Sequence, residues 1–221
     1  GLFVFLLFSF RGYAQQTDYV DFKTAKITIG IIPDSSKVMG MVDYEFKILK
    51  PADSIYINAV NMNFNNVFIV NNKVSYRNDG KKLWLKSSFK KDSLYNVSFN
   101  YDAYPKKALY YIDWKNEEKN QQIWTQGQGK YTSHWFPSFD DVNEKVIFNM
   151  NISFDKNYNV IANGVLKDVF PDKNKKIWKY EMKKPMSSYL LAIAIGDYVN
   201  KTVASAFVIG ASAIVTFFIL V

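Results

Sequence analysis

The stretch Lys-Val-Ile-Phe-Asn-Met-Asn-Ile-Ser-Phe, residues 145–154, decides the fold class of this chain. Apolar residues occupy every second position in it, and a period of two residues is typical of a β-strand that buries one face. The same period recurs in residues 42–48 and in residues 178–182. A helical period of twelve or more residues does not occur between residues 17 and 200. The body of the chain is therefore expected to consist of strands.

Short polar turn signals separate the expected strands, and they lie at residues 33–36, 51–53, 78–80, 155–157, 163–164 and 171–174. Asp79-Gly80 predicts the clearest hairpin, because glycine accepts the positive φ that such a turn needs. Strands joined by turns this short pair as antiparallel neighbours, and a flat sheet of about ten or more strands would leave its edges exposed. We therefore predict an all-β fold, a large antiparallel curved sheet or sandwich with hairpin connections.

The composition is that of a packed globular protein and excludes several function classes. Of the 221 residues, 48% are hydrophobic and 22% charged. The chain has no cysteine and one histidine, His134, so mechanisms that need a second histidine are excluded and a self-contained metal site is not expected. The formal net charge is +8, but only Arg11 and Arg77 are arginine. Because base reading and bidentate phosphate contacts favour arginine, no nucleic-acid partner is predicted.

Both ends of the chain are apolar. Residues 2–8 form an apolar run, and the small-residue junction at residues 12–14 follows it, as in the core and cleavage site of a secretory signal peptide. We interpret residues 1–14 as a remnant of such a signal, which predicts an exported protein, periplasmic or on the cell surface. Residues 203–221 carry no charge, and a helix of that length would nearly match a hydrocarbon core. The tail at 201–221 is therefore either a transmembrane helix, which would make the membrane a partner, or the product of truncation or a frameshift.

Four motifs follow one another in the second half of the chain. They are Thr125-Gln126-Gly127-Gln128, Pro137-Ser138-Phe139-Asp140, the strand at 145–154 with the later Asn163-Gly164 turn, and Pro185-Met186-Ser187-Ser188-Tyr189-Leu190 with Gly196-Asp197. In this order they resemble the N-terminal β-saddle domain of the aminopeptidase N and leukotriene-hydrolase family of zinc metallopeptidases. The resemblance is specific from about residue 122 to 198 and only architectural before residue 120. It implies a saddle-like form for the predicted domain at residues 15–200.

The resemblance implies a part in peptide hydrolysis that this chain does not complete alone. In the family, the domain packs against a thermolysin-like catalytic domain with an H-E-x-x-H zinc helix and a Gly-x-Met-x-Asn loop. Neither motif occurs in this sequence. Zinc is thus implied for the full-length enzyme, whereas no cofactor, no metal ligand and no catalytic residue is expected in this chain, which should be inactive by itself.

The same resemblance implies two substrate-binding residues. The second polar residue of the family's Thr-Gln-x-Glu/Gln motif maps onto Gln128, and Gln126 is the weaker candidate. An aminopeptidase must hold the free α-ammonium of its peptide substrate so that the first peptide bond is correctly placed, and the carboxamide oxygen of Gln128 can accept one ammonium hydrogen. In the alternative interpretation, both glutamines alternate on one strand and bond to neighbouring backbone groups.

Residues 138–142 depart from the family's pattern. The usual Cys-Trp-Asp-Glu-Pro is Ser-Phe-Asp-Asp-Val here, so the proline is lost. Asp140 is expected to be a turn residue or a helix N-cap rather than a catalytic acid, and His134 a surface or interface residue rather than a metal ligand.

Three hypotheses follow. In the leading one, the chain is the N-terminal domain of an exported zinc-dependent aminopeptidase, which recognises the substrate N-terminus and packs against a catalytic domain outside this sequence. The alternative is a membrane-anchored β-sandwich binding module without catalysis. A third possibility is a non-catalytic saddle domain that pairs with a separate peptidase chain.

Overall fold

The computed structural model describes residues 15–69, 72–114, 120–199 and 219–220. The predicted signal remnant at residues 1–14 lies outside the described residues, as does the predicted tail at 201–221 except for residues 219–220. Among the helical segments that are described, none has the length and apolar character needed to cross a membrane.

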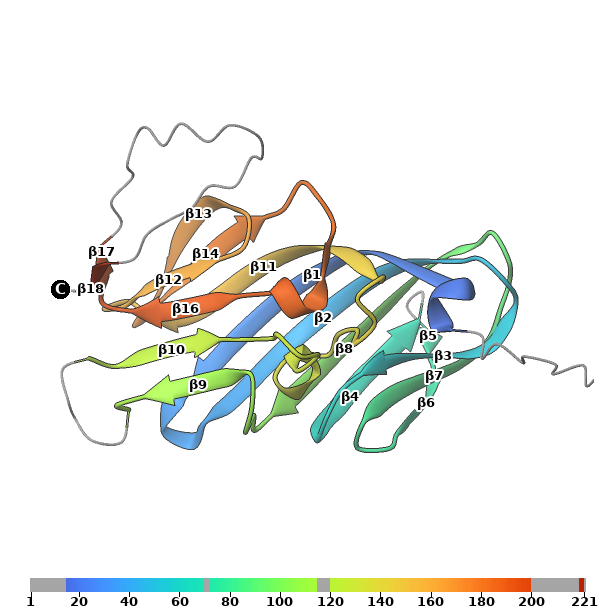
Figure 1. Ribbon diagram of the computed structural model, residues 1–221, viewed down its shortest axis with the longest axis horizontal. Coiled ribbons are helices and arrows are strands. Elements are labelled where there is room, and N and C mark those ends of the chain that lie inside the picture. Colours follow the sequence, from blue (N-terminus) through green and yellow to red (C-terminus); the bar gives the residue numbers. More distant parts are fainter. Residues whose placement is uncertain (1–14, 70–71, 115–119, 200–218, 221) are drawn as a thin grey trace, which may run out of the picture.

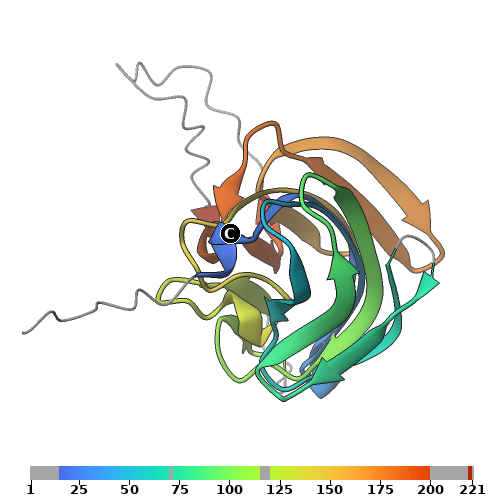
Figure 2. The same ribbon diagram turned by 90° about the vertical axis from the view of Figure 1, so that its right-hand side faces the viewer.

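The largest sheet contains nine strands of the described part of the chain and runs diagonally through the molecule (Figure 1). Eight of them are hydrogen-bonded in the order β13-β14-β11-β1-β2-β8-β4-β5, and β15 pairs with the start of β11. Their bounds are β1 Val20–Ile32, β2 Lys37–Ile48, β4 Met62–Ile69, β5 Asn72–Lys73, β8 Leu94–Ala103, β11 Lys145–Asp155, β13 Val165–Asp172, β14 Lys175–Glu181 and β15 Met186–Ser187. The sheet is strongly curved (Figure 2).

Smaller sheets, counted over the described ranges, complete the fold. A four-stranded sheet has the order β12-β16-β10-β9, a three-stranded sheet the order β3-β7-β6, and β17 pairs with β18. Their bounds are β3 Ala52–Asn58, β6 Ser75–Asn78, β7 Lys82–Phe89, β9 Leu109–Ile112, β10 Gln122–Thr125, β12 Asn159–Ala162, β16 Ile193–Gly196, β17 Tyr198–Val199 and β18 Ile219–Leu220. Short 3-10 helices lie at η1 Gln16–Asp18, η2 Pro33–Ser35, η3 Thr132–His134 and η4 Ser188–Leu190.

The hydrophobic core lies between the large sheet on one side and the four-stranded and three-stranded sheets on the other. Phe22 on β1, Tyr44 on β2, Ile57 on β3, Ile123 on β10 and Ile195 on β16 all belong to it and are 0% exposed. Full burial of an aliphatic or aromatic side chain contributes roughly 1.5–3 kcal/mol each. The predicted all-β fold of curved, packed sheets is therefore confirmed.

The period of two predicted for residues 42–48 and 145–154 is confirmed by burial. On both β2 and β11, buried side chains alternate with side chains that are at least partly exposed. The outer face of the large sheet carries polar groups, among them Lys26, Asp43 and Glu45. An antiparallel sheet with one buried and one solvated face produces this alternation.

One pair at the centre of the sheet differs from the prediction of purely antiparallel neighbours. Strands β1 and β11 are parallel, in register from Thr24 opposite Ile147 to Gly30 opposite Ser153. Parallel neighbours need a connection of about a dozen residues or more, and here the chain forms the three-stranded sheet and then β9 and β10 before it returns to β1. Short local turns predict only sequential pairs, so this pairing was outside what they could indicate.

The predicted Asp79-Gly80 hairpin is confirmed. Strands β6 and β7 are antiparallel, with Asn78 opposite Leu83, and Gly80 has a φ of +81°. The Asp79 carboxylate accepts hydrogen bonds from the backbone N–H groups of the turn and, at 2.7 Å, from Trp84 Nε1. These hydrogen bonds lower the pKa of Asp79, because they stabilise its charged form.

Candidate functional site

The turn that carries Gln126 and Gln128 begins where β10 ends. Strand β10 stops at Thr125, so the two glutamines follow the strand rather than alternate on it. Both side chains are exposed to solvent. The backbone N–H of Gln126 donates to the carbonyl oxygen of Ala108 at 2.9 Å, which fixes the start of the turn against the chain that leads into β9. The structure thus presents two exposed carboxamides at one end of the four-stranded sheet.

Gly127 explains why this turn has a fixed position. The residue is buried, and a Cβ atom added to it would lie 2.6 Å from the carbonyl oxygen of Tyr189 in η4 and would also contact Thr132. Thr132 Oγ1 in turn donates to the carbonyl oxygen of Ser188 at 3.0 Å. Glycine is therefore required by the close approach of two backbone segments, and η4 supports the turn from below. The motif at residues 185–190 and the motif at residues 125–128 meet at this contact.

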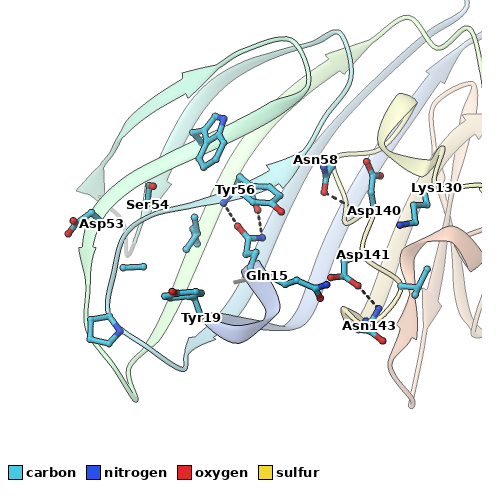
Figure 3. A pocket seen from close by; sticks show the side chains of 16 residues that line it. Gln15, Tyr19, Asp53, Ser54, Tyr56, Asn58, Lys130, Asp140, Asp141 and Asn143 are labelled. Atoms are coloured by element: carbon cyan, nitrogen blue, oxygen red, sulfur yellow. Dashed lines mark hydrogen bonds between the residues drawn. The ribbon is translucent and has the colours of Figure 1, made fainter. Parts of the chain in front are cut away.

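A groove of about 790 Å³ lies next to this turn (Figure 3). Its walls come from η1, from β3, from Lys130 in the glutamine-bearing turn and from residues 140–143. The backbones of Asn58 and Ser138 hold two of these walls together through paired hydrogen bonds of 2.8 and 2.9 Å. Lys130, two residues after Gln128, lines the groove beside Asp140 and Asp141.

Asp140 lies in a bend of the backbone, and no described helix begins at it. Its backbone N–H donates to Asn58 Oδ1 at 3.1 Å, directly after the bridge between Asn58 and Ser138. Burial raises the pKa of the Asp140 carboxyl, and nearby groups such as Lys130 offset only part of this rise. The Ser133 hydroxyl is close enough to lower the same pKa but does not have hydrogen-bonding geometry.

His134 lies in η3, and the described residues do not fit a zinc site around it. Its ring makes an edge contact with Tyr131 at a centroid distance of 5.7 Å, and partial burial lowers its pKa. Across the described ranges, no three His, Cys, Asp or Glu side chains come together in a way that could hold a metal ion. We therefore assign no metal chemistry to these residues.

Glu144 is a titratable residue that sequence reasoning missed. It directly precedes β11, is 4% exposed, and accepts the backbone N–H of Phe22 at 3.2 Å where the pairing of β1 with β2 is irregular. Burial raises the pKa of Glu144 to about 8, and the neighbouring Asp21 and Asp141 add to the rise. A single glutamate next to a strand is ordinarily expected to be exposed to solvent, so nothing in the local sequence indicated that Glu144 is buried.

Comparisons with known proteins agree with the resemblance found in the sequence. "Probable aminopeptidase 1" of Sulfurisphaera tokodaii is 22% identical over 154 residues, which are 70% of this chain and 19% of that protein. "Probable aminopeptidase 2" of the same organism is 23% identical over 155 residues, 70% of this chain and 20% of that protein. The chain thus spans about a fifth of the length of these curated relatives.

Solved structures share the fold. The M1 zinc metallopeptidase from Deinococcus radiodurans has a TM-score of 0.75 at 11% identity, with 84% of this chain and 44% of that chain covered. Yeast LTA4 hydrolase in complex with bestatin has a TM-score of 0.71 at 20% identity, with 88% of this chain and 32% of that chain covered. At such identities the likeness establishes the fold. The family model described as "Peptidase M1 N-terminal domain" matches residues 18–190, and the chain therefore belongs to this family.

Proposed function

We propose that this chain is the N-terminal domain of an exported zinc-dependent aminopeptidase and that Gln128 binds the free α-amino group of the peptide substrate. The observation that carries the proposal is the exposed Gln128 side chain on a turn held by the buried Gly127. A side chain that positions a substrate must be accessible and must stand on a backbone with little freedom to move.

The chemistry of the carboxamide suits this role. The side-chain oxygen of Gln128 can accept a hydrogen bond from an ammonium group, and hydrogen bonds to charged groups contribute roughly 1.5–3 kcal/mol. This range corresponds to about ten- to 150-fold in binding or rate. Gln126 is the second candidate, because its side chain is exposed on the same turn while its backbone is tied to Ala108.

We assign hydrolysis to a catalytic domain outside this sequence. The named relatives are about five times longer than the matched region, and this sequence contains no H-E-x-x-H motif. The described residues also offer no fitting set of zinc ligands. The part of this domain is then to pack against the catalytic domain and to complete its substrate site.

The encoding gene provides the first test. Its DNA beyond residue 205, read in all frames, is expected to contain an H-E-x-x-H motif with a later glutamate. If no frame contains these residues, the assignment to an aminopeptidase is refuted.

Kinetics of the complete enzyme test the role of Gln128. Gln128→Ala is expected to lower kcat/KM for L-alanine p-nitroanilide by about ten- to 100-fold, and Gln128→Glu, which adds a charge facing the ammonium, should retain most of it. Gln126→Ala should cost less. Asn65→Ala, which removes an exposed carboxamide from β4, is the matched control and should leave kcat/KM unchanged. Unchanged kinetics for Gln128→Ala would refute the assignment of Gln128.

Export is tested separately from catalysis. The apolar run at residues 2–8 and the junction at residues 12–14 support removal of a signal peptide. N-terminal sequencing of the protein recovered from the periplasm or cell surface should give a chain that starts near Gln15. An uncleaved chain confined to the cytoplasm would contradict this part of the proposal.

A further inference from the structure

Strand β3 forms an edge of the three-stranded sheet and borders the groove. Among the described strands it pairs with β7 alone, and the pairing is regular from Ser54 opposite Lys86 to Asn58 opposite Lys82, after a register shift between Ala52 and Ser54. In an antiparallel pair, the backbone groups of alternate residues point away from the partner strand. The groups of Ser54, Tyr56 and Asn58 therefore point away from β7. In Figure 3 these three residues follow one another along the rim of the groove.

Two of the three outward positions already hold a peptide-like partner. The Gln16 side chain accepts the backbone N–H of Tyr56 at 2.7 Å and donates to its carbonyl oxygen at 2.8 Å. The backbone of Ser138 pairs in the same manner with Asn58. A carboxamide has the same donor and acceptor as a peptide group, so the geometry at Tyr56 is that of an added strand. By the same alternation, the backbone groups of Ser54 face the groove.

The charge of the groove is opposite to that of the chain. Three carboxylates line it, those of Asp53, Asp140 and Asp141, with one lining ammonium group, that of Lys130. A second ammonium group, that of Lys82, lies 3.6 Å from the ring centroid of the groove residue Tyr56. The chain as a whole has a formal net charge of +8. Asp140 Oδ1 is buried without a hydrogen-bond partner among the described residues, and the burial raises the pKa of this carboxyl. A further cation in the groove would favour the charged form of this carboxyl.

We propose that the groove binds an extended segment of a separate polypeptide, which adds to the free edge of β3 at Ser54 and carries lysine or arginine side chains toward the carboxylates. Backbone hydrogen bonds at an exposed edge provide affinity in this mode, and the flanking side chains provide selectivity. The outward backbone groups of Tyr56 and Asn58 are already bonded to Gln16 and Ser138, so the segment bonds to β3 at Ser54 and otherwise lies along the groove. The inference does not depend on Gln128 and goes beyond the proposed function.

Charge also selects among partners. An acidic peptide or a nucleic acid is attracted by the net charge of the chain but repelled by the three carboxylates of the groove. A basic peptide is repelled by the chain as a whole, so that its binding must come from a local site. Preference for a basic peptide would therefore indicate binding at the groove rather than general attraction to the chain.

Fluorescence anisotropy tests the proposal with this chain as it stands. The probe is a fluorescein-labelled heptapeptide of sequence Lys-Thr-Lys-Val-Lys-Thr-Lys with blocked ends, in about 0.1 M salt, where the Debye length is about 10 Å. It should bind, whereas its glutamate counterpart should bind at least about tenfold more weakly. A version with proline at every second position, which lacks every second backbone N–H and cannot continue as a regular strand, should also bind at least about tenfold more weakly. Equal binding of the proline version would overturn the strand-addition mode.

Variants locate the binding. The double change Asp140→Asn with Asp141→Asn should weaken binding of the lysine peptide about tenfold. The pair Asp34→Asn with Asp172→Asn removes the same charge from exposed residues outside the groove and should have little effect. Ser54→Pro removes one backbone N–H from the edge, and proline is tolerated in edge strands. This variant should bind the lysine peptide about tenfold more weakly than Ser54→Ala.

Equal effects of the groove pair and the control pair would overturn the site. If this chain binds the lysine peptide but the complete enzyme does not, another part of the enzyme covers the edge of β3. That result would overturn the proposal of a separate partner.

Discussion

Glu144→Gln should stabilise the protein, and more so as the pH rises. The pKa of a free glutamate is near 4.5, and burial raises that of Glu144 to about 8, so the folded protein retains a proton on Glu144 that the unfolded chain loses between these values. Stability is then lost as the pH rises from about 4.5 to about 8. One pKa unit corresponds to about 1.36 kcal/mol, which sets an upper bound of roughly 5 kcal/mol on this loss. Glutamine removes the titration and retains the oxygen that accepts the Phe22 N–H.

Urea unfolding at pH 5, 6, 7 and 8, followed by tryptophan fluorescence, measures the effect. The free energy of unfolding of Glu144→Gln should match that of the unchanged protein within about 1 kcal/mol at pH 5 and exceed it by a few kcal/mol at pH 8. Glu45→Gln, the same change on the outer face of β2, is the control and should alter the free energy of unfolding at pH 8 by less than Glu144→Gln does. A difference that stays constant with pH, or a variant that is less stable at pH 8, would refute the reasoning.

Two further substitutions test the packing around the glutamine-bearing turn and the core. Gly127→Ala should lower the free energy of unfolding by about 1–3 kcal/mol, because the new Cβ would clash with the Tyr189 carbonyl oxygen. Gly30→Ala is the control and should cost much less, because its Cβ would meet a single side-chain atom at 3.8 Å. Calorimetric melting compares the two variants, and equal losses of stability would contradict the close contact at Gly127. Tyr44→Phe leaves the buried Pro137 carbonyl oxygen without the hydroxyl that donates to it at 2.6 Å, so urea unfolding should show a loss of about 1–2 kcal/mol, and an unchanged midpoint would be the contrary result.

The fold could be predicted to the extent that it depends on local periodicity. Alternation in residues 42–48 and 145–154 indicated strands with one buried face, and Asp79-Gly80 indicated a hairpin; both are observed. The parallel pairing of β1 with β11 could not be inferred, because it depends on where the chain returns after the three-stranded sheet and then β9 and β10. The residue types in a turn do not indicate which strands pair when the strands lie so far apart in the sequence.

One part of the candidate site could likewise be predicted from the sequence, and another part could not. The run from Thr125 to Gln128 is contiguous, so a sequence motif can reveal it, and the structure adds that Gly127 is fixed by contact with η4. The role of Gln128 in substrate binding stays a prediction. The groove could not be anticipated, because its walls come from four segments far apart in the sequence, which contacts such as those of Gln16 with Tyr56 and of Asn58 with Ser138 bring together.

The central position of β1 has a consequence for biosynthesis. Strands β1 and β2 leave the ribosome early and can pair at once, but β1 lacks its second neighbour until β11 has been translated, more than a hundred residues later. Through that interval the nascent chain displays an unpaired, apolar strand, the kind of surface that recruits other unfinished chains. Synthesis of residues 145–155, rather than closure of the first hairpin, should therefore end the exposure of this edge of β1.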